Sequence, residues 1–419
     1  MKDFCFRPSD ILLPDPALGD GSRWSCVACD QYTSQPDYWE RADTLVGDAP
    51  STLRLILPEV YLAETDARVP VIHATMEAYL RDVLVSHPDS MILVRRTLGD
   101  GKVRTGLVGA IDLETYDFRP GSDALIRATE KTVPERIPPR TVIRRGAPVE
   151  LPHVMLLIDD SERTVIEPLA ARADAYPVAY DHDLMQGGGH ITGRFLDAEA
   201  QHKVLTALGA LITPDAMAAR YGRADLAPLL FAVGDGNHSL AAAKTCFEEL
   251  KAKIGVEAAA THPMRYALCE VVNLYDESLE FEPIYRVVFG VEPHRIAEDF
   301  KAYAAALDGD AAPHDILLHS GDIHLTVTVP HPVSALAVGT VQDFFNQYTL
   351  PSGAEVDYIH GEDTAHAVGE RDGALCFLFD GMKKDELFST VISDGSLPRK
   401  TFSMGHAEDK RYYTEARRL

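Results

Sequence analysis

A short stretch near the middle of the chain, Gly234-Asp-Gly-Asn-His-Ser239, carries residue types that chemistry on an anionic group requires. The Asp235 carboxylate can accept a proton or bind Mg²⁺, and the His238 imidazole can position or stabilise a group in transfer. The remaining positions would contact a phosphate: Gly234, Gly236, Asn237 and Ser239. Because Gly, Asp and Asn also adopt turn conformations easily, an ordinary structural turn is an equally open interpretation.

The flanking residues predict the elements that must position this stretch. The apolar run Pro228–Val233 has the length of a strand, and the alanine-rich run Leu240–Leu250 predicts a helix. A helix start carries unpaired N–H groups and partial positive charge, so it can hold an anion. Strand, turn and helix would thus place Asp235 and His238 beside a phosphate-binding helix start.

Phosphoryl transfer also needs cations against the developing negative charge. The chain is acidic overall, with a net charge of −24, so its small basic clusters are exceptions: Arg95-Arg96, Arg136 to Arg145, and Arg399-Lys400. We expect the neutralising cations among Arg54, Arg286 and Lys400. Each of these side chains could equally form a surface charge or a structural ion pair.

Several site classes are excluded by the motifs that are missing. The sequence has no Gly-x-x-x-x-Gly-Lys-Ser/Thr loop, no protein-kinase signature set and no Gly-x-Ser-x-Gly elbow. The central turn lacks the third glycine of the dinucleotide fingerprint. Cys26 and Cys29 form a single CxxC pair without two further ligands, which favours packing over a zinc site.

Composition restricts the partners. A surface with this acidic excess repels a phosphate backbone, so nucleic acid is an unexpected partner and a small-molecule substrate is expected. No apolar run is long enough to span a membrane, and the first residues show no apolar signal region. Six scattered cysteines fit reduced thiols. We therefore expect a cytoplasmic protein without membrane contact, and self-association into a homo-oligomer is left open.

The order of predicted elements indicates an α/β fold, of the mixed α+β kind with substantial antiparallel sheet. A helix is predicted over Val69–Val85, a strand within Asp48–Pro58, and a hairpin from Met91–Thr97 and Lys102–Ile111. Gly187–His190 would be a hairpin loop or a lid. From residue 265 onward, strands and helices alternate to residue 393. We expect one interlocked body over 1–419, with a possible boundary near 130–150 that separates 1–140 from 141–419, because a proline-rich connector lies there.

At these residues the sequence resembles the DUF1015 family. Gly234-Asp-Gly-Asn-His-Ser239 resembles that family's Asp-Gly-His-His-Arg signature, and Leu397-Pro-Arg-Lys-Thr401 resembles its C-terminal Met-Pro-x-Lys-Ser/Thr. Pro283-Ile-Tyr-Arg286 is similar to its Pro-x-His-Arg, and Glu130-Lys-Thr132 to its Glu-x-Thr. Asp30 falls where the family has a Pro-Tyr-Asp near the start. The ordered motifs span most of the chain.

The signature also looks like the core motif of ParB/sulfiredoxin-type domains, which include free-serine kinases. The resemblance implies such a core around the strand–turn–helix at 228–250 and a role in phosphoryl transfer to L-serine from a nucleotide. This sequence departs from the signature in having Asn237 for the first His and Ser239 for the Arg, and Tyr285 replaces the His of the other motif. The Arg would bind phosphate through two hydrogen bonds.

The leading hypothesis is therefore a phosphotransferase acting on L-serine or phosphoserine, with Mg²⁺ and ADP or ATP as cofactors. Asp235 would be the base or the Mg²⁺ ligand, His238 would position the transferring group, and Lys400 would take part in catalysis. Arg286, Arg54 and Asp30 would bind phosphate or substrate. Two alternatives remain: a nucleotide- or metabolite-binding regulatory protein without turnover, and a phosphatase for phosphoserine.

Overall fold

The computed structural model describes residues 4–132 and 137–419, which divide into two compact units. Unit 1 contains Met1–Leu279 and Gly405–Leu419, and unit 2 contains Glu280–Met404. The boundary expected near 130–150 lies within unit 1, where α3 (Ile137–Arg144) packs against α7 (Asn237–Ile254). Residues 133–136 of the proline-rich connector lie outside the described residues. In the part of the chain that is described, no helix is both long and apolar enough to cross a membrane.

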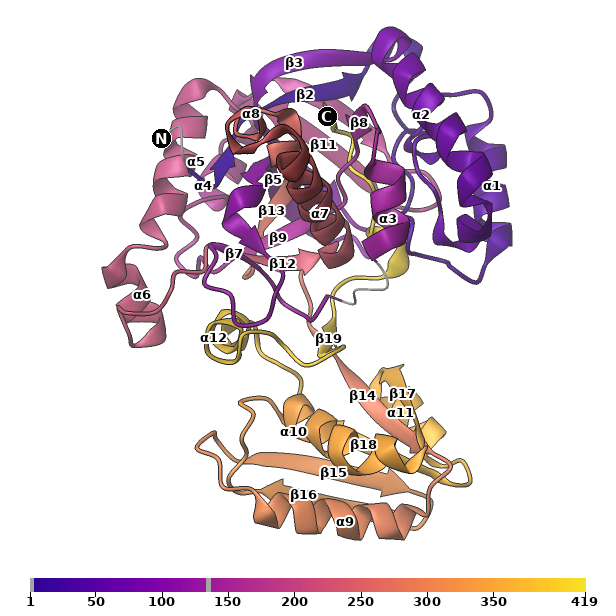
Figure 1. The fold of residues 1–419 in the computed structure, drawn as a ribbon, viewed down its shortest axis with the longest axis vertical. Helices are drawn as coiled ribbons and strands as arrows, with labels where there is room; N and C mark the ends of the chain where they lie inside the picture. The colour runs from indigo at the N-terminus through magenta and orange to yellow at the C-terminus, as the bar shows by residue number, and fades with distance from the viewer. Residues whose placement is uncertain (1–3, 133–136) are drawn as a thin grey trace. The chain divides into compact units, whose positions relative to one another are not determined.

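A large mixed sheet forms the centre of unit 1 (Figure 1). Its strands in spatial order, within the described residues, are β10 (Val178–Asp183), β11 (His190–Phe195), β4 (Ile92–Thr97), β5 (Val103–Asp112), β13 (Tyr266–Asn273), β9 (Met155–Ile158), β12 (Phe231–Asp235), β7 (Ile126–Ala128) and β6 (Tyr116–Asp117), with β1 (Phe6–Arg7) beside β5. Strand pairs from β10 to β13 are antiparallel. The antiparallel component that the sequence predicts is therefore confirmed.

Parallel pairs occur only near the central turn, among the pairings of this sheet that are described. β12 runs parallel to β7, with Val233 opposite Ala128, and antiparallel to β9. Because parallel strands end at the same edge of a sheet, the residues after β7 and after β12 emerge side by side. This register brings the Glu130-Lys-Thr132 segment to the edge at which Asp235 ends its strand.

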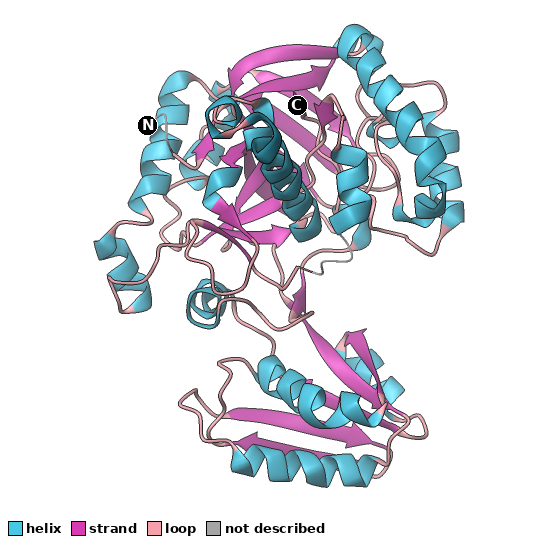
Figure 2. Ribbon diagram, in the orientation of Figure 1, coloured by secondary structure: helices cyan, strands magenta, loops and turns pink. Residues whose placement is uncertain are grey.

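Helices cover one face of the large sheet. α5 (Ala198–Ala210) and α7 contribute Val204, Leu208, Leu240 and Phe247 to a core shared with sheet residues such as Val233. Alternate residues of a strand point to opposite faces, so the two faces need separate cores. Shorter helices complete the described part of this region: α4 (Glu167–Ala170), α6 (Pro214–Tyr221) and α8 (Val256–Ala259). Figure 2 shows the long α7 helix over the strands.

A smaller sheet covers the opposite face. Its order is β3 (Leu84–Ser90), β2 (Ser9–Pro14), β20 (Ala416–Arg418) and β8 (Val149–Glu150), so segments from both ends of the chain pair within unit 1. Ile11 and Leu13 of β2 pack with Val94, Val108 and Leu268 of the large sheet. The other face of the small sheet packs on α2 (Thr65–Asp82), and α1 (Pro36–Val46) precedes it in the chain.

Unit 2 contains an antiparallel sheet. Its described order is β16 (Ile323–Val329), β15 (His314–Ser320), β18 (Ala374–Phe379), β14 (Glu282–Phe289) and β17 (Glu355–His360), with β19 (Phe402–Ser403) beside β14. The helices are α9 (Pro293–Ala306), α10 (Ala337–Phe344), α11 (Glu362–Gly369) and α12 (Lys384–Asp394). Phe300 of α9 meets Phe344 and Phe377 in an aromatic core, with ring centroids 5.0 and 5.3 Å away. Ala365 of α11 packs with Cys376 instead.

Most predicted elements are confirmed and two are corrected. The hairpin of β4 and β5 and the alternation after residue 265 are as predicted. The strand predicted within Asp48–Pro58 is wrong, because Thr52–Arg54 forms a 3₁₀ turn that the Ser51 hydroxyl caps. The predicted helix over Val69–Val85 ends at Asp82, and the following residues join β3. The glycine tract connects β10 to β11 as a hairpin loop.

Candidate functional site

The turn after β12 is shorter than its sequence suggests. β12 ends at Asp235 and α7 begins at Asn237, so Gly236 alone joins them. Gly236 adopts a left-handed conformation with φ of 81°, and a Cβ there would lie 3.0 Å from Val154 Cα. Glycine is the residue that this backbone and this close approach allow. His238 and Ser239 therefore belong to the first turn of the helix, and not to the loop that the sequence predicts.

The start of α7 has the features of an anion-binding helix end. Its N-terminus receives no hydrogen bond from the Gly236 cap, and its first turn contains no acidic side chain. The N–H groups of a first turn have no partner within the helix, and the helix dipole adds partial positive charge there. His238 is half-buried in this turn.

Asp235 lies beside a lysine from the C-terminal segment. One carboxylate oxygen accepts a 2.9 Å hydrogen bond from the Gly236 N–H, and the other lies 4.0 Å from Lys410 Nζ. Both side chains keep about a quarter of their surface exposed, at 28% for Asp235 and 25% for Lys410. The pair can therefore reach a ligand, and Lys410 supplies a cation next to the turn.

His153 is the buried centre of the site. It lies just before β9, and its Nε2 shares a 3.0 Å hydrogen bond with the Ser239 hydroxyl. The residue is 8% exposed, and its ring packs edge-on against Tyr412 with centroids 4.9 Å apart. Burial lowers the pKa of His153, and the charges of Asp30 and Asp235 offset this only in part. His153 is thus a neutral imidazole with carboxylates on two chain segments around it.

Asp30 joins the same cluster through ion pairs. Its carboxylate lies 3.3 Å from the Arg140 guanidinium, which also pairs with Glu59 at 2.6 Å. Burial raises the pKa of Asp30, but His153, a hydrogen bond from Gln31, Arg140 and Lys410 outweigh it, so the net pKa is lowered. Asp30 is therefore ionised at neutral pH. The structure brings Asp30 and Asp235, which are distant in sequence, to one imidazole.

The segment after β7 completes the surroundings of the turn. The Thr129 hydroxyl donates a 2.8 Å hydrogen bond to the Val233 carbonyl, which fixes the two parallel strand ends together. Glu130 follows directly, at the strand edge shared with Asp235. Three of the segments that carry the family resemblance therefore meet here: the Asp30 loop, the Glu130-Lys-Thr132 segment and the central turn.

Of the three cations predicted from the sequence, Arg54 belongs to unit 1, and Arg286 and Lys400 belong to unit 2. Arg54 pairs with Asp43 and donates a 2.8 Å hydrogen bond to the Gly47 carbonyl at the end of α1. Arg286 is fully buried in unit 2, where its guanidinium donates to the carbonyls of Ile284 and Arg399. Lys400, also in unit 2, places Nζ 5.0 Å from the Tyr358 ring. A role for Arg286 and Lys400 toward Asp235 stays a prediction.

Sequence reasoning missed three site residues: His153, Arg140 and Lys410. Arg140 lies within the basic cluster Arg136 to Arg145, which was a signal that something acidic would lie opposite. No local pattern marks His153 or Lys410, because their partners come from remote parts of the chain. Lys410 comes beside Asp30 and Asp235 because the C-terminal segment is hydrogen-bonded to the N-terminal loop. In this contact the Ala28 N–H donates to the Lys410 carbonyl at 2.7 Å.

Oxygen atoms at the turn suit Mg²⁺. Among the described residues, no group of three or more His, Cys, Asp or Glu side chains could hold a metal ion. Mg²⁺ needs fewer protein ligands, because it keeps several waters and binds through one or two carboxylates plus substrate phosphates. Asp235 provides such a carboxylate. Asn237 Oδ1 is buried without a hydrogen-bond partner in the described structure, so it is a second oxygen that a cation could satisfy.

A small cavity opens beside the imidazole. It has a volume of about 110 Å³. Its lining includes His153 and Ser239, apolar side chains such as Met76, and the charged residues Arg140, Arg144 and Glu150. Cys29 also faces it, and burial raises the pKa of this thiol to about 12, so Cys29 stays protonated.

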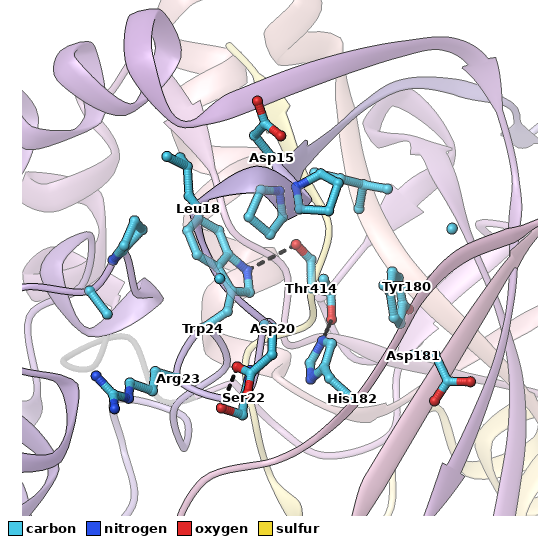
Figure 3. A pocket seen from close by; sticks show the side chains of 18 residues that line it. Asp15, Leu18, Asp20, Ser22, Arg23, Trp24, Tyr180, Asp181, His182 and Thr414 are labelled. Carbon is cyan, nitrogen blue, oxygen red and sulfur yellow. Dashed lines mark hydrogen bonds between the residues drawn. The ribbon is translucent and has the colours of Figure 1, made fainter.

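Unit 1 has a second cavity, of about 690 Å³. None of the residues predicted for the site lines it, and much of its lining comes from the N-terminal segment Leu13–Trp24. Figure 3 shows its lining, in which the Trp24 indole N–H donates to the Thr414 carbonyl at 3.0 Å. His182 lies 3.5 Å from the Thr414 hydroxyl, and burial lowers its pKa. Asp15, Asp20 and Asp181 surround the cavity with Arg23. Its size is that of a small-molecule site.

The fold and the site define a mixed α/β protein with carboxylates, cations and an imidazole gathered at a strand-to-helix turn. The chain belongs to the family described as Protein of unknown function (DUF1015), which matches residues 11–353. No curated protein gives a significant sequence match.

Two solved structures are similar to parts of the chain. A conserved hypothetical protein from Pyrococcus furiosus has 11% identity and a TM-score of 0.34, over 74% of this chain and 94% of that one. SbnI with a C-terminal truncation from Staphylococcus aureus has 9% identity and a TM-score of 0.33, over 74% of this chain and 82% of that one.

Proposed function

We propose that this protein is a phosphotransferase that acts on L-serine or phosphoserine with a nucleotide and Mg²⁺. The observation that carries the proposal is the meeting of Asp30 and Asp235 with Arg140 and Lys410 at the start of α7. Phosphoryl transfer depends mainly on positioning and charge stabilisation, which need an anion cradle, a carboxylate and nearby cations. The family resemblance supports the same reaction, and β12 with α7 would form the ParB/sulfiredoxin-like core.

The substrate would be held by charge on both of its ends. The carboxylate of Asp30 is ionised and half-buried, so it suits the ammonium group of serine. The helix start of α7 suits the phosphate, and Lys410, 4.0 Å from Asp235, would supply positive charge in place of the motif's arginine. This arrangement offers a physical account of how Ser239 can replace that arginine without loss of phosphate binding.

The reaction transfers one phosphoryl group and one proton. The serine hydroxyl oxygen forms a bond to the terminal phosphorus of ATP while the bond from that phosphorus to the ADP oxygen breaks. The hydroxyl proton passes to the Asp235 carboxylate, which acts as the base, and His238 positions the phosphoryl group. Asp235 and Asn237 Oδ1 would hold Mg²⁺, and the bound ion would supply neutralisation of the phosphate charge. Lys410 and Arg140 stabilise the charge that develops on the transferring group.

Product analysis separates kinase from phosphatase. We would incubate the full chain with L-serine, ATP and Mg²⁺, and separately with phosphoserine in the presence and absence of ADP. A kinase forms phosphoserine in the first mixture, and forms ATP from phosphoserine only when ADP is present. Release of inorganic phosphate from phosphoserine without ADP would identify a phosphatase. Absence of turnover in every mixture would contradict the proposal.

A regulatory protein that binds a metabolite without turnover is the second candidate, and the 690 Å³ cavity favours it. Trp24 lines this cavity, and the chain has only two tryptophans. A Trp39→Phe variant would therefore report binding through Trp24 alone. Nucleotide that changes Trp24 fluorescence and raises the melting temperature, with no product formed, would support this candidate over the enzyme. An unchanged fluorescence and melting temperature would contradict it.

A further inference from the structure

Unit 2 gathers three cations around one aromatic ring. The centroid of the Tyr358 ring lies 5.1 Å from Arg286 Cζ, 5.8 Å from Arg399 Cζ and 5.0 Å from Lys400 Nζ. Tyr358 of β17 stands directly opposite Arg286 of β14, so the register of the sheet places both side chains on one face. In a chain with a net charge of −24, this gathering of positive charge is an exception.

A buried arginine fixes the turn that carries the two other cations. Arg286 is fully buried, and its guanidinium donates a 2.6 Å hydrogen bond to the Arg399 carbonyl. The buried Thr401 hydroxyl donates a 2.7 Å hydrogen bond to the Pro398 carbonyl, which closes the same turn. Arg399 and Lys400 therefore project from a backbone that buried groups hold in place.

The tip of this turn presents its charges to solvent. Arg399 and Lys400 are both exposed, and within the described part of the chain Arg399 forms no ion pair. Lys400 has φ of 51°, a conformation that is uncommon for residues other than glycine and that persists where the surroundings enforce it. Asp357 precedes Tyr358 in β17 and lies on the opposite face of the sheet, because successive strand residues alternate.

The two exposed side chains differ in a way that suits a ligand with several charged oxygens. The Arg399 guanidinium can donate two parallel hydrogen bonds to one phosphate group, and the Lys400 ammonium can reach a second group as a point charge. Positive charges held close together repel one another, and a bound anion removes this repulsion. A single carboxylate satisfies only one of these side chains, whereas linked phosphate groups satisfy both.

We propose that Arg399 and Lys400 form a binding site in unit 2 for a diphosphate or triphosphate group, either inorganic or carried by a nucleotide. Arg286 and Tyr358 act as positioning residues, since one holds the turn and the other lies against the charged groups. The site goes beyond the proposed phosphoryl transfer, because binding of the anion needs neither serine nor Asp235.

Chemical modification of arginine in the full chain tests the proposal. We would treat the protein with phenylglyoxal, without serine or Mg²⁺, and follow each arginine by peptide mass spectrometry. Inorganic triphosphate and ATP at ten times their dissociation constants should each slow the modification of Arg399 about tenfold, and adenosine should not slow it. Arg295, an exposed arginine of α9, is the internal control and should react at the same rate throughout.

The two sources of the anion are separated in the same experiment. Equal half-protection concentrations for triphosphate and ATP would show that the site binds the phosphate groups alone. A lower concentration for ATP would assign the site to a nucleotide. Protection by adenosine without protection by triphosphate would overturn the proposal.

A matched pair of lysine variants completes the test. Lys400→Met should raise the triphosphate concentration that half-protects Arg399 by at least about tenfold, because one charge-assisted contact is lost. Lys301→Met removes a cation of α9 that pairs with Glu298, and it should leave this concentration unchanged. Equal values for the two variants, or an Arg399 rate in wild type that neither triphosphate nor ATP changes, would overturn the proposal. Neither result depends on serine phosphorylation, which the assay omits.

Discussion

Replacing Gly236 with alanine should destabilise unit 1 more than the same change at another left-handed glycine. Gly236 has φ of 81°, and its added Cβ would lie 3.0 Å from Val154 Cα and 3.4 Å from the His153 carbonyl oxygen. Gly222, at the end of α6, has φ of 72° and open space within 4 Å of an added Cβ. Gly222→Ala is therefore a matched control that carries the conformational penalty alone.

The two penalties can be separated in size. An alanine in the left-handed region costs about 1 kcal/mol, and this cost applies to both variants. Overpacking against a backbone atom that cannot move freely adds about 1 to 3 kcal/mol. We therefore expect Gly222→Ala to lower the free energy of unfolding by about 1 kcal/mol and Gly236→Ala by about 3 kcal/mol. The difference between the variants measures how tightly the turn packs on the strand that carries His153.

Tryptophan fluorescence during urea unfolding is a suitable assay, because Trp24 and Trp39 both lie in unit 1 and are the two tryptophans of the chain. The free energy of unfolding follows by linear extrapolation, with an unchanged slope if only the native state is affected. Equal losses for Gly236→Ala and Gly222→Ala would refute the reasoning. Because the clash displaces the His153–Val154 segment, Gly236→Ala should also reduce turnover where Gly222→Ala does not.

Further predictions concern charges. Lys410→Met should lower kcat/KM for phosphoryl transfer by about a hundredfold, because one fixed cation is lost, yet change the free energy of unfolding by less than about 1 kcal/mol. The matched control is Lys203→Met, which removes an exposed ion pair with Glu199. Equal kcat/KM values for the two variants would contradict the role of Lys410. Glu415 is fully buried beside the Tyr180 hydroxyl, and burial raises its pKa to about 7, with Glu270 adding to the effect. The folded state therefore binds a proton more tightly than the unfolded state, so the stability from this group is present at low pH and is lost as pH rises from about 4.5 through 7. Between pH 5 and pH 8, the free energy of unfolding measured in urea should fall by roughly 3 kcal/mol more for wild type than for Glu415→Gln. The same pH dependence in both proteins would contradict the raised pKa of Glu415.

Much of the fold was predictable where the pattern was local. The β4–β5 hairpin and the elements after residue 265 carry clear periodicity and turn residues, and the structure confirms them. The strand within Asp48–Pro58 fails because Ser51 and Thr52 hydroxyls donate to the Trp24 carbonyl instead of leaving the backbone to a ladder. The α1 helix, Pro36–Val46, was not predicted at all, although Pro36 stands at the first helical position that suits proline.

The central strand, turn and helix were predictable, but the cations around them were not. The central turn was recognisable from a strand, a glycine and a helix in sequence, and Asp30 was placed by family resemblance. Lys410 comes from a segment that pairs with the N-terminal loop, and Arg140 comes from α3. Which cation meets a carboxylate depends on chain topology, and one sequence does not contain that information in any local pattern. The same limit applies to His153, whose partner Ser239 lies on another element.

The central claim is that Asp235 serves phosphoryl transfer at the start of α7. Phosphorus NMR of wild type and Asp235→Asn, each with L-serine, ATP and Mg²⁺, tests it most directly, with Asp225→Asn as a control at an exposed ion pair. We predict a phosphoserine resonance with wild type and Asp225→Asn, and none with Asp235→Asn, while the urea transition of Asp235→Asn stays cooperative. Phosphoserine formed equally by Asp235→Asn, or absent from the wild-type reaction, would contradict the claim.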